Sequence, residues 1–221
     1  MKKVIDIALD IETLSKRETA AIISIAALPF DKYDIKERPE MFPDLLVKEG
    51  GCSSLEPFYQ VVNATSCALI GMHFEMDTVR FWAEQSPEAK AALLGDDIVS
   101  IGTAMESFVK YIECLKEKYD ADIHIWAQGL DFDIPIVRNA IRTAINQITY
   151  PWEYSHVRCA RTNILETIEQ LYGLLDDPYS VLPKYEGNGC RHCAMFDAER
   201  LAFNVRYLSD LLQSKLNPIK A

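Results

Sequence analysis

Near the start of the sequence lies Lys3-Val-Ile-Asp-Ile-Ala-Leu-Asp10-Ile-Glu12-Thr13, and the fold prediction starts from this stretch. Residues 3–10 are apolar and β-branched, which predicts a buried strand. Two acids separated by one residue, Asp10 and Glu12, stand at its end. Residues i and i+2 of an extended chain point to the same side. We therefore expect the two carboxylates to converge, either in a site or as ordinary solvated acids at a strand end.

A second apolar run follows closely. Residues 20–30 are rich in isoleucine, and the polar stretch 13–19 separates them from the first run, so the two are predicted to form a hairpin. Residues 45–48 predict a third strand before the break at Gly50-Gly51. Residues 52–72 are predicted to be irregular.

Helical patterns dominate the rest of the chain. They are predicted over Asp77–Gln85 with Asp77 as N-cap, from Ser86-Pro87 to a stop at Gly95, and over Ser100–Lys118, Asp133–Ile145, Thr162–Leu174 and Ala194–Leu216. One short buried strand, residues 123–127, lies among them, and residues 176–190 are predicted to form a loop. Strands come first and one returns after helices. This order predicts an α/β fold, a mixed β-sheet flanked by α-helices, with residues 1–221 as a single domain.

Composition narrows the classes of function. The chain has 221 residues, of which 49% are hydrophobic and 25% charged, so a sizeable core is expected. No apolar run is long enough to span a bilayer and the N-terminus does not resemble a signal peptide, which predicts a cytoplasmic protein with no membrane association. The net charge of −10 argues against a protein that coats nucleic acid through Lys and Arg. It still allows an enzyme that reaches phosphates through bound cations.

Two further segments place acids where helices are predicted to begin. Trp126 leads through a glycine-containing turn to Asp133, although an acid there also suits an N-cap and Asp131 could serve equally. Asp197 lies on the apolar face of the last predicted helix, where a carboxylate is costly to bury unless it is paired or binds a metal. His192 precedes it and, taken alone, would be read as a surface histidine.

Taken in order, the three segments resemble the DEDD superfamily of 3′-to-5′ exonucleases, in the branch that uses histidine. The motif matches are Asp-x-Glu at Asp10 and Glu12, Phe-Asp at Phe132 and Asp133, and His-x-x-x-x-Asp at His192 and Asp197. The resemblance extends over nearly the whole chain. Ribonuclease T-like members are similar around Ile23-Ser-Ile25, and small bacterial exoribonucleases and related phage exonucleases are similar at residues 81–86, 126–133 and 158–162.

The resemblance implies a ribonuclease H-like fold and hydrolysis of single-stranded RNA or DNA from the 3′ end, releasing 5′-mononucleotides. It implies two Mg²⁺ or Mn²⁺ ions held by Asp10, Glu12, Asp133 and Asp197, with His192 as general base. Hard cations prefer oxygen ligands, and two ions roughly 4 Å apart can activate a water and stabilise a leaving oxygen. Because relatives in the family are often dimers, a homodimer is compatible with it.

The chain departs from the usual family pattern at three positions. Gln128, Cys159 and Phe196 stand where relatives often carry an asparagine or an acid. None of the three replaces a predicted metal ligand, so these departures concern substrate contacts.

Three other hypotheses stay open on the sequence. Cys190, His192 and Cys193 form half of a zinc signature, which Cys159 or His156 could complete. A non-catalytic nucleic-acid-binding module could keep the same fold. A carboxylate phosphohydrolase would instead cleave small phosphate esters. The choice between RNA and DNA depends on contacts to the 2′-OH, which sequence does not give.

Overall fold

A mixed five-stranded sheet forms the centre of the computed structural model, which describes residues 3–30, 32, 56–94, 97–187 and 189–216. The strand order is β3-β2-β1-β4-β5. The strands are β1 (Lys3–Thr13), β2 (Ile22–Phe30), β3 (Phe58–Val61), β4 (Ala121–Ala127) and β5 (Val157–Cys159). β1 pairs antiparallel with β2 and parallel with β4, so it lies in the middle of the sheet. The predicted hairpin and the mixed sheet are confirmed.

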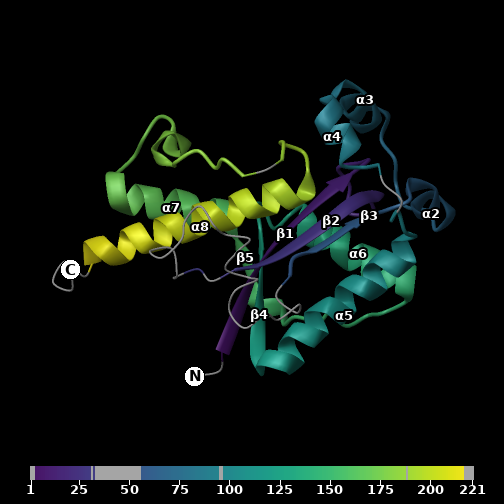
Figure 1. The fold of residues 1–221 in the computed structure, drawn as a ribbon, viewed down its shortest axis with the longest axis horizontal. Helices are drawn as coiled ribbons and strands as arrows, with labels where there is room; N and C mark the ends of the chain where they lie inside the picture. Colours follow the sequence, from purple (N-terminus) through teal and green to yellow (C-terminus); the bar gives the residue numbers. More distant parts are fainter. Residues whose placement is uncertain (1–2, 31, 33–55, 95–96, 188, 217–221) are drawn as a thin grey trace.

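Helices cover both faces of this sheet (Figure 1). They are α2 (Ala64–Leu69), α3 (Met76–Glu84), α4 (Pro87–Ala91), α5 (Ile101–Tyr119), α6 (Asp133–Ile145), α7 (Ala160–Tyr172) and α8 (Ala194–Leu216). α5 and α6 pack on one face, and α7 and α8 on the other. Short α3 and α4 lie beyond the C-terminal end of β1. The flanking helices predicted from sequence are confirmed, α6 and α8 with the bounds expected.

The side chains of β1 divide between the two layers because a strand alternates its faces. Ile5, Ile7, Leu9 and Ile11 are buried in the cluster formed with α5 and α6. Ala8, between them, joins the cluster on the α8 side. By the same alternation, Asp10 and Glu12 project towards α8.

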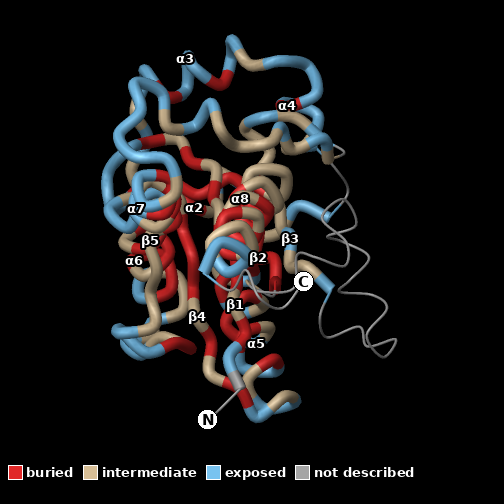
Figure 2. The backbone as a smooth tube through the Cα atoms, turned by 90° about the vertical axis from the view of Figure 1, so that its left-hand side faces the viewer, coloured by how far each residue is buried: buried red, intermediate tan, exposed pale blue. Residues whose placement is uncertain are grey.

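α8 approaches the sheet closely because the facing side chains are small. Ala194, Ala198 and Ala202 on the helix and Ala8 and Ala26 on the strands are all inaccessible to solvent. α8 contacts both β1 and β2 along this surface. Figure 2 shows the buried residues concentrated along the strands and α8. The N-terminal turn of α8, with Asp197, is thereby fixed beside the end of β1.

Several predictions about local structure were wrong. Residues 52–72 are not irregular throughout, because β3 and α2 lie within them; β3 is an edge strand of only four residues, none of them fully buried. The N-cap of α3 is Glu75 and not Asp77, which lies in the first turn of the helix. By contrast, the loop predicted at 176–190 is confirmed, because its described residues form no α-helix or strand and only one 3₁₀ turn, Pro178–Val181. β5 was not predicted, since its three residues resemble the start of the following helix.

The predicted starts of two helices agree with the structure, and other predictions concern residues that the structure does not describe. Ser86 and Ser100 cap α4 and α5 through their hydroxyl groups. The predicted strand at 45–48 and the breaks at Gly50-Gly51 and Gly95 lie outside the described residues. Among the helices that the structure describes, none is long and apolar enough to cross a membrane.

The close packing of α8 predicts sensitivity to side-chain volume. Ala202→Leu should lower the free energy of unfolding by about 1–3 kcal/mol, because the added atoms have no space between helix and sheet. Denaturant unfolding of the variant and the wild type measures this difference. Gln213→Leu, on an exposed part of the same helix, is the control and should change little. Equal stability of Ala202→Leu and wild type would show that α8 packs more loosely than described.

Candidate active site

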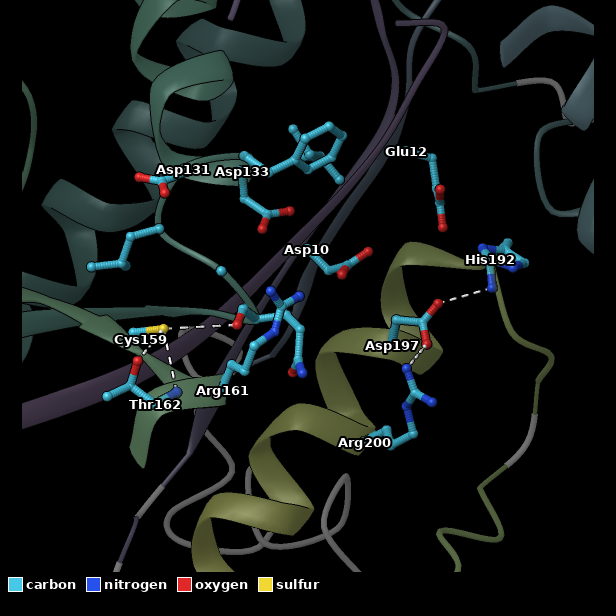
Figure 3. A pocket seen from close by; sticks show the side chains of 15 residues that line it. Asp10, Glu12, Asp131, Asp133, Cys159, Arg161, Thr162, His192, Asp197 and Arg200 are labelled. Atoms are coloured by element: carbon cyan, nitrogen blue, oxygen red, sulfur yellow. Dashed lines mark hydrogen bonds and ion pairs between the residues drawn. The ribbon is translucent and has the colours of Figure 1, made fainter. Parts of the chain in front are cut away.

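A cavity of about 680 Å³ opens at the C-terminal end of β1. It is bounded by β1, by the turn after β4, and by the first residues of α6, α7 and α8 (Figure 3). All five residues predicted to carry the chemistry line it: Asp10, Glu12, Asp133, His192 and Asp197. Segments separated by more than 180 positions in the chain therefore meet in one place.

Asp133 occupies this cavity because of the turn that follows β4. The residue begins α6 and is only 4% exposed. Its carboxylate points towards Asp10 in Figure 3, whereas Asp131 is exposed at the rim. Backbone N–H groups of Asp133 and Ile11 donate to the Asp133 carboxylate. Geometry thus places Asp133, rather than Asp131, among the other acids.

Asp197 is held by two partners at the start of α8. The backbone N–H of His192 donates to its Oδ2 at 2.8 Å, and Arg200 Nη2 lies 2.7 Å from its Oδ1. Arg200 is three residues further along, so the pair follows helical spacing. Oδ1 is buried and, apart from this ion pair with Arg200, has no hydrogen-bond partner.

Burial and mutual repulsion raise the pKa values of the acids in the cavity. Burial, followed by the charges of Asp133, Glu12 and Asp197, raises the pKa of Asp10 well above its ordinary value. Burial and the charges of Asp197 and Asp133 raise the pKa of Glu12 to about 8. Burial raises the pKa of Asp133 to about 7, against the opposing charge of Arg161. Such a concentration of carboxylates has excess negative charge that a cation would neutralise.

The arrangement fits divalent cations. One ligand atom each from Glu12, His192 and Asp197 lies within 4.8 Å of the others. Oδ1 of Asp197 and the carboxylates of Asp10 and Asp133 add oxygen ligands, which Mg²⁺ and Mn²⁺ prefer. The residues present therefore suit the cofactor that the sequence predicted.

Comparisons with known proteins agree with the geometry. A model of the 3′-5′ exoribonuclease Rv2179c-like domain matches residues 5–209. The chain belongs to this family. An exodeoxyribonuclease of Enterobacteria phage T4 is 30% identical over 141 residues, which are 62% of this chain and 56% of that protein. The chain thus matches just over half of the phage protein's length.

The family fold is also recognised in a solved structure. The nuclease domain of 3′hExo, a DEDDh family member bound to rAMP, superposes with a TM-score of 0.53. The match covers 93% of this chain and 92% of that domain, at 14% identity. This likeness confirms the predicted ribonuclease H-like fold.

The zinc hypothesis finds little support among the described residues. Cys190 and Cys193 are in contact, but the one group of three or more candidate ligands in the described part of the chain contains neither of them. His156 packs against His124, and the Cys159 sulfur accepts from the backbone N–H of Thr162 at the start of α7.

Sequence reasoning missed three residues around the site. Arg161 and Arg200 line the cavity and supply its positive charge; helical spacing from Asp197 could have indicated Arg200. Phe81 is 40% exposed, and its ring meets the His192 imidazole edge-on at 5.0 Å between centroids. The neighbouring Trp82 is buried, and its Nε1–H donates to the Thr13 carbonyl at 2.9 Å.

The raised pKa values predict how the stability of the metal-free protein depends on pH. In the unfolded chain Glu12 and Asp133 lose their protons near pH 4, whereas in the fold they hold them to about pH 8 and 7. Between about pH 4 and pH 8 the folded state therefore binds more protons than the unfolded chain. The free energy of unfolding is not reduced by these two acids below about pH 4, and it falls as pH rises from 4 to 8.

Thermal melts in a chelator from pH 4 to pH 8 measure this loss. Glu12→Gln should flatten the decline, and added Mg²⁺ should raise the melting temperature most at pH 8, because cations bind the ionised carboxylates. Glu113→Gln, on an exposed part of α5, should leave the decline unchanged. A stability that rises with pH in parallel for wild type and Glu12→Gln would contradict the proposed repulsion.

Proposed function

We propose that this protein removes nucleotides from the 3′ end of single-stranded nucleic acid, using divalent cations and releasing 5′-mononucleotides. The observation that carries the proposal is the convergence of Asp10, Glu12, Asp133 and Asp197 with His192 in one cavity. Membership of an exoribonuclease family supports the 3′-to-5′ polarity.

The four carboxylates would hold two Mg²⁺ or Mn²⁺ ions. When bound, such ions neutralise the phosphodiester and favour attack by water and departure of the leaving oxygen. Asp133 is the most buried of the four, and Asp10 and Glu12 from β1 and Asp197 from α8 line the cavity beside it. Because these groups come from three different elements, the cage requires the folded sheet.

His192 is placed to accept the proton of the attacking water at a ring nitrogen. It lines the cavity, and its ligand nitrogen lies within 4.8 Å of carboxylate oxygens of Glu12 and Asp197. Phe81 packs edge-on against the imidazole and limits the orientations it can adopt. Arg161 and Arg200 add positive charge on the cavity wall, where they would orient the phosphate.

The size and charge of the site favour action at a chain end. A cavity of about 680 Å³ is in the range that encloses a small ligand and would admit a terminal nucleotide. The net charge of −10 offers little attraction for a long duplex outside the site. The family description favours RNA, whereas the phage relative is an exodeoxyribonuclease, so both polymers belong in the test.

A non-catalytic binding module with this fold is the second candidate. It would be favoured by loss of one carboxylate, but all four line the cavity beside a histidine. A hydrolase of small phosphate esters is the third, and substrate assays separate it from an exonuclease.

The polarity of digestion tests the proposal directly. A 5′-labelled single-stranded oligonucleotide with Mg²⁺ or Mn²⁺ should give a ladder that shortens from its 3′ end, and chelator should stop the reaction. Matched RNA and DNA strands, a circular strand and p-nitrophenyl thymidine 5′-phosphate are the comparison substrates. Cleavage of the circular strand, or of the small ester alone, would refute exonuclease action; tight binding without cleavage would favour the binding module.

Paired substitutions test the acid in the second segment. Asp133→Asn should abolish cleavage and raise the melting temperature of the metal-free protein, because one source of repulsion is removed. Asp131→Asn is the matched control, two residues away and exposed, and should retain most of its activity. The reverse pattern in the two turnover rates would assign the ligand to Asp131.

His192 is tested by its effect on turnover. His192→Ala should lower kcat roughly 10²- to 10⁴-fold, the usual contribution of general acid–base catalysis. The Mg²⁺ concentration for half-maximal rate should change little, since the carboxylates hold the ions. His156→Ala, whose ring packs on His124 outside the cavity, is the control. Wild-type turnover in His192→Ala would exclude the proposed role.

A further inference from the structure

A pair of cysteines flanks the histidine of the site. Cys190 and Cys193 are both partly buried, and their Sγ atoms lie 2.8 Å apart. His192 stands between them in the chain, with a φ of 65° in the left-handed region that non-glycine residues rarely adopt. Neither thiol belongs to the carboxylate cluster, so the proposed hydrolysis leaves this pair without a role.

Each cysteine is anchored to a different part of the fold. Cys190 packs against the apolar cluster of Ile23, Trp82 and Ala89, which joins β2 to α3 and α4. The carbonyl of Cys193 accepts the backbone N–H of Asp197 at 3.0 Å, in the first turn of α8. The segment carrying His192 therefore spans the gap between two fixed points, and the two sulfur atoms meet across it.

We propose that Cys190 and Cys193 are a dithiol modification site that reacts with low-molecular-weight disulfides and closes into a disulfide that holds the His192 segment in its present position. This inference goes beyond the proposed exonuclease function, and the formation of the bond does not depend on it.

The reaction proceeds by thiol–disulfide exchange. One cysteine thiolate attacks the small disulfide, forming a mixed disulfide and releasing one small thiol. The second cysteine then attacks the mixed disulfide, forming the Cys190–Cys193 bond and releasing the other small thiol. The protein loses two electrons and two protons, and the small disulfide gains both, so the exchange is balanced and is reversed by excess small thiol.

Closure preserves the arrangement of the site because the sulfur atoms already touch. The bond brings them to about 2.05 Å, which requires a movement of less than about 1 Å. The anchors on either side, at the apolar cluster and at α8, stay in place. The His192 N–H continues to donate to Asp197 Oδ2, so the disulfide acts as a clasp on a segment with an unfavourable backbone conformation.

The other described cysteines are not placed to do the same. Cys67 is buried and its thiol donates a hydrogen bond to the Ile22 carbonyl. The Cys159 sulfur accepts a hydrogen bond from the Thr162 hydroxyl at the start of α7. Cys114 is exposed on α5. It should accept a small thiol as a stable mixed disulfide and thereby serve as an internal control for the reagent.

Peptide mapping by mass spectrometry tests the bond itself. After treatment of the full-length, metal-free protein with oxidised glutathione, the wild-type peptides containing Cys190 and Cys193 should be joined, with the loss of two hydrogens and no glutathione. In Cys190→Ser the remaining Cys193 should retain glutathione, and in Cys193→Ser so should Cys190. Free thiols or separate adducts at both positions in wild type, with Cys114 modified, would overturn the proposal.

A thermal melt and an activity assay test whether the disulfide holds the His192 segment in its present position. Oxidised wild type should melt on the order of 5 °C above reduced wild type, since the bond restricts the unfolded chain, while Cys190→Ser should show no such gain. Oxidised wild type should keep its turnover within about twofold of the reduced enzyme. Loss of turnover only after oxidation would overturn the clasp; absence of turnover in both forms would refute the exonuclease function and leave the mapped bond intact.

Discussion

The close packing of α8 against β1 and β2 is the constraint on which the site depends. Alanines on both sides allow the helix backbone to approach the sheet, and this approach carries Asp197 to the end of β1. The same strand presents isoleucine and leucine to the opposite layer, which fixes its register. A one-residue slip of β1 would turn Asp10 and Glu12 into the apolar core formed with α5 and α6. Core packing and the carboxylate cluster are therefore two consequences of one alternation.

Bringing several acids together in a partly buried cavity opposes folding. The raised pKa values of Asp10, Glu12 and Asp133 express this conflict, since each acid resists ionisation beside the others. Arg161 and Arg200 relieve it only in part, because both stand at the wall of the cavity. Natural proteins accept such local strain at functional sites, where a ligand compensates for it. Here the compensating ligand would be a divalent cation.

The position of His192 depends on a different set of contacts. Its imidazole packs on Phe81, which belongs to α3, and α3 is tied to β1 through the bond from Trp82 to the Thr13 carbonyl. Thr13 directly follows Glu12, so the helix that supports the histidine is attached beside a member of the acid cluster. The neighbouring cysteines fix the other side of the same segment. The geometry of the proposed base thus relies on α3, α8 and β1 together.

Local sequence patterns predicted the elements with strong periodicity and supplied the candidate site residues. The alternation in residues 3–13, the bounds of α6 and α8 and the order of the three acid motifs were all accessible, because local patterns record which face of an element is buried. Family resemblance then linked motifs that are far apart in the chain. The edge strand β3 and the short strand β5 were not accessible, because their residues are only partly buried and hydrogen bonding to neighbouring strands defines them.

The tertiary structure placed Asp133, the first residue of α6, among the other acids and left Asp131 exposed, a difference in burial that the sequence does not show. It also revealed Phe81 beside His192 and the contact between Cys190 and Cys193. The physical reason is the same in each case. A local pattern states which residues can be buried, but the partner of a side chain depends on how separate elements pack, and that is decided when the whole chain folds.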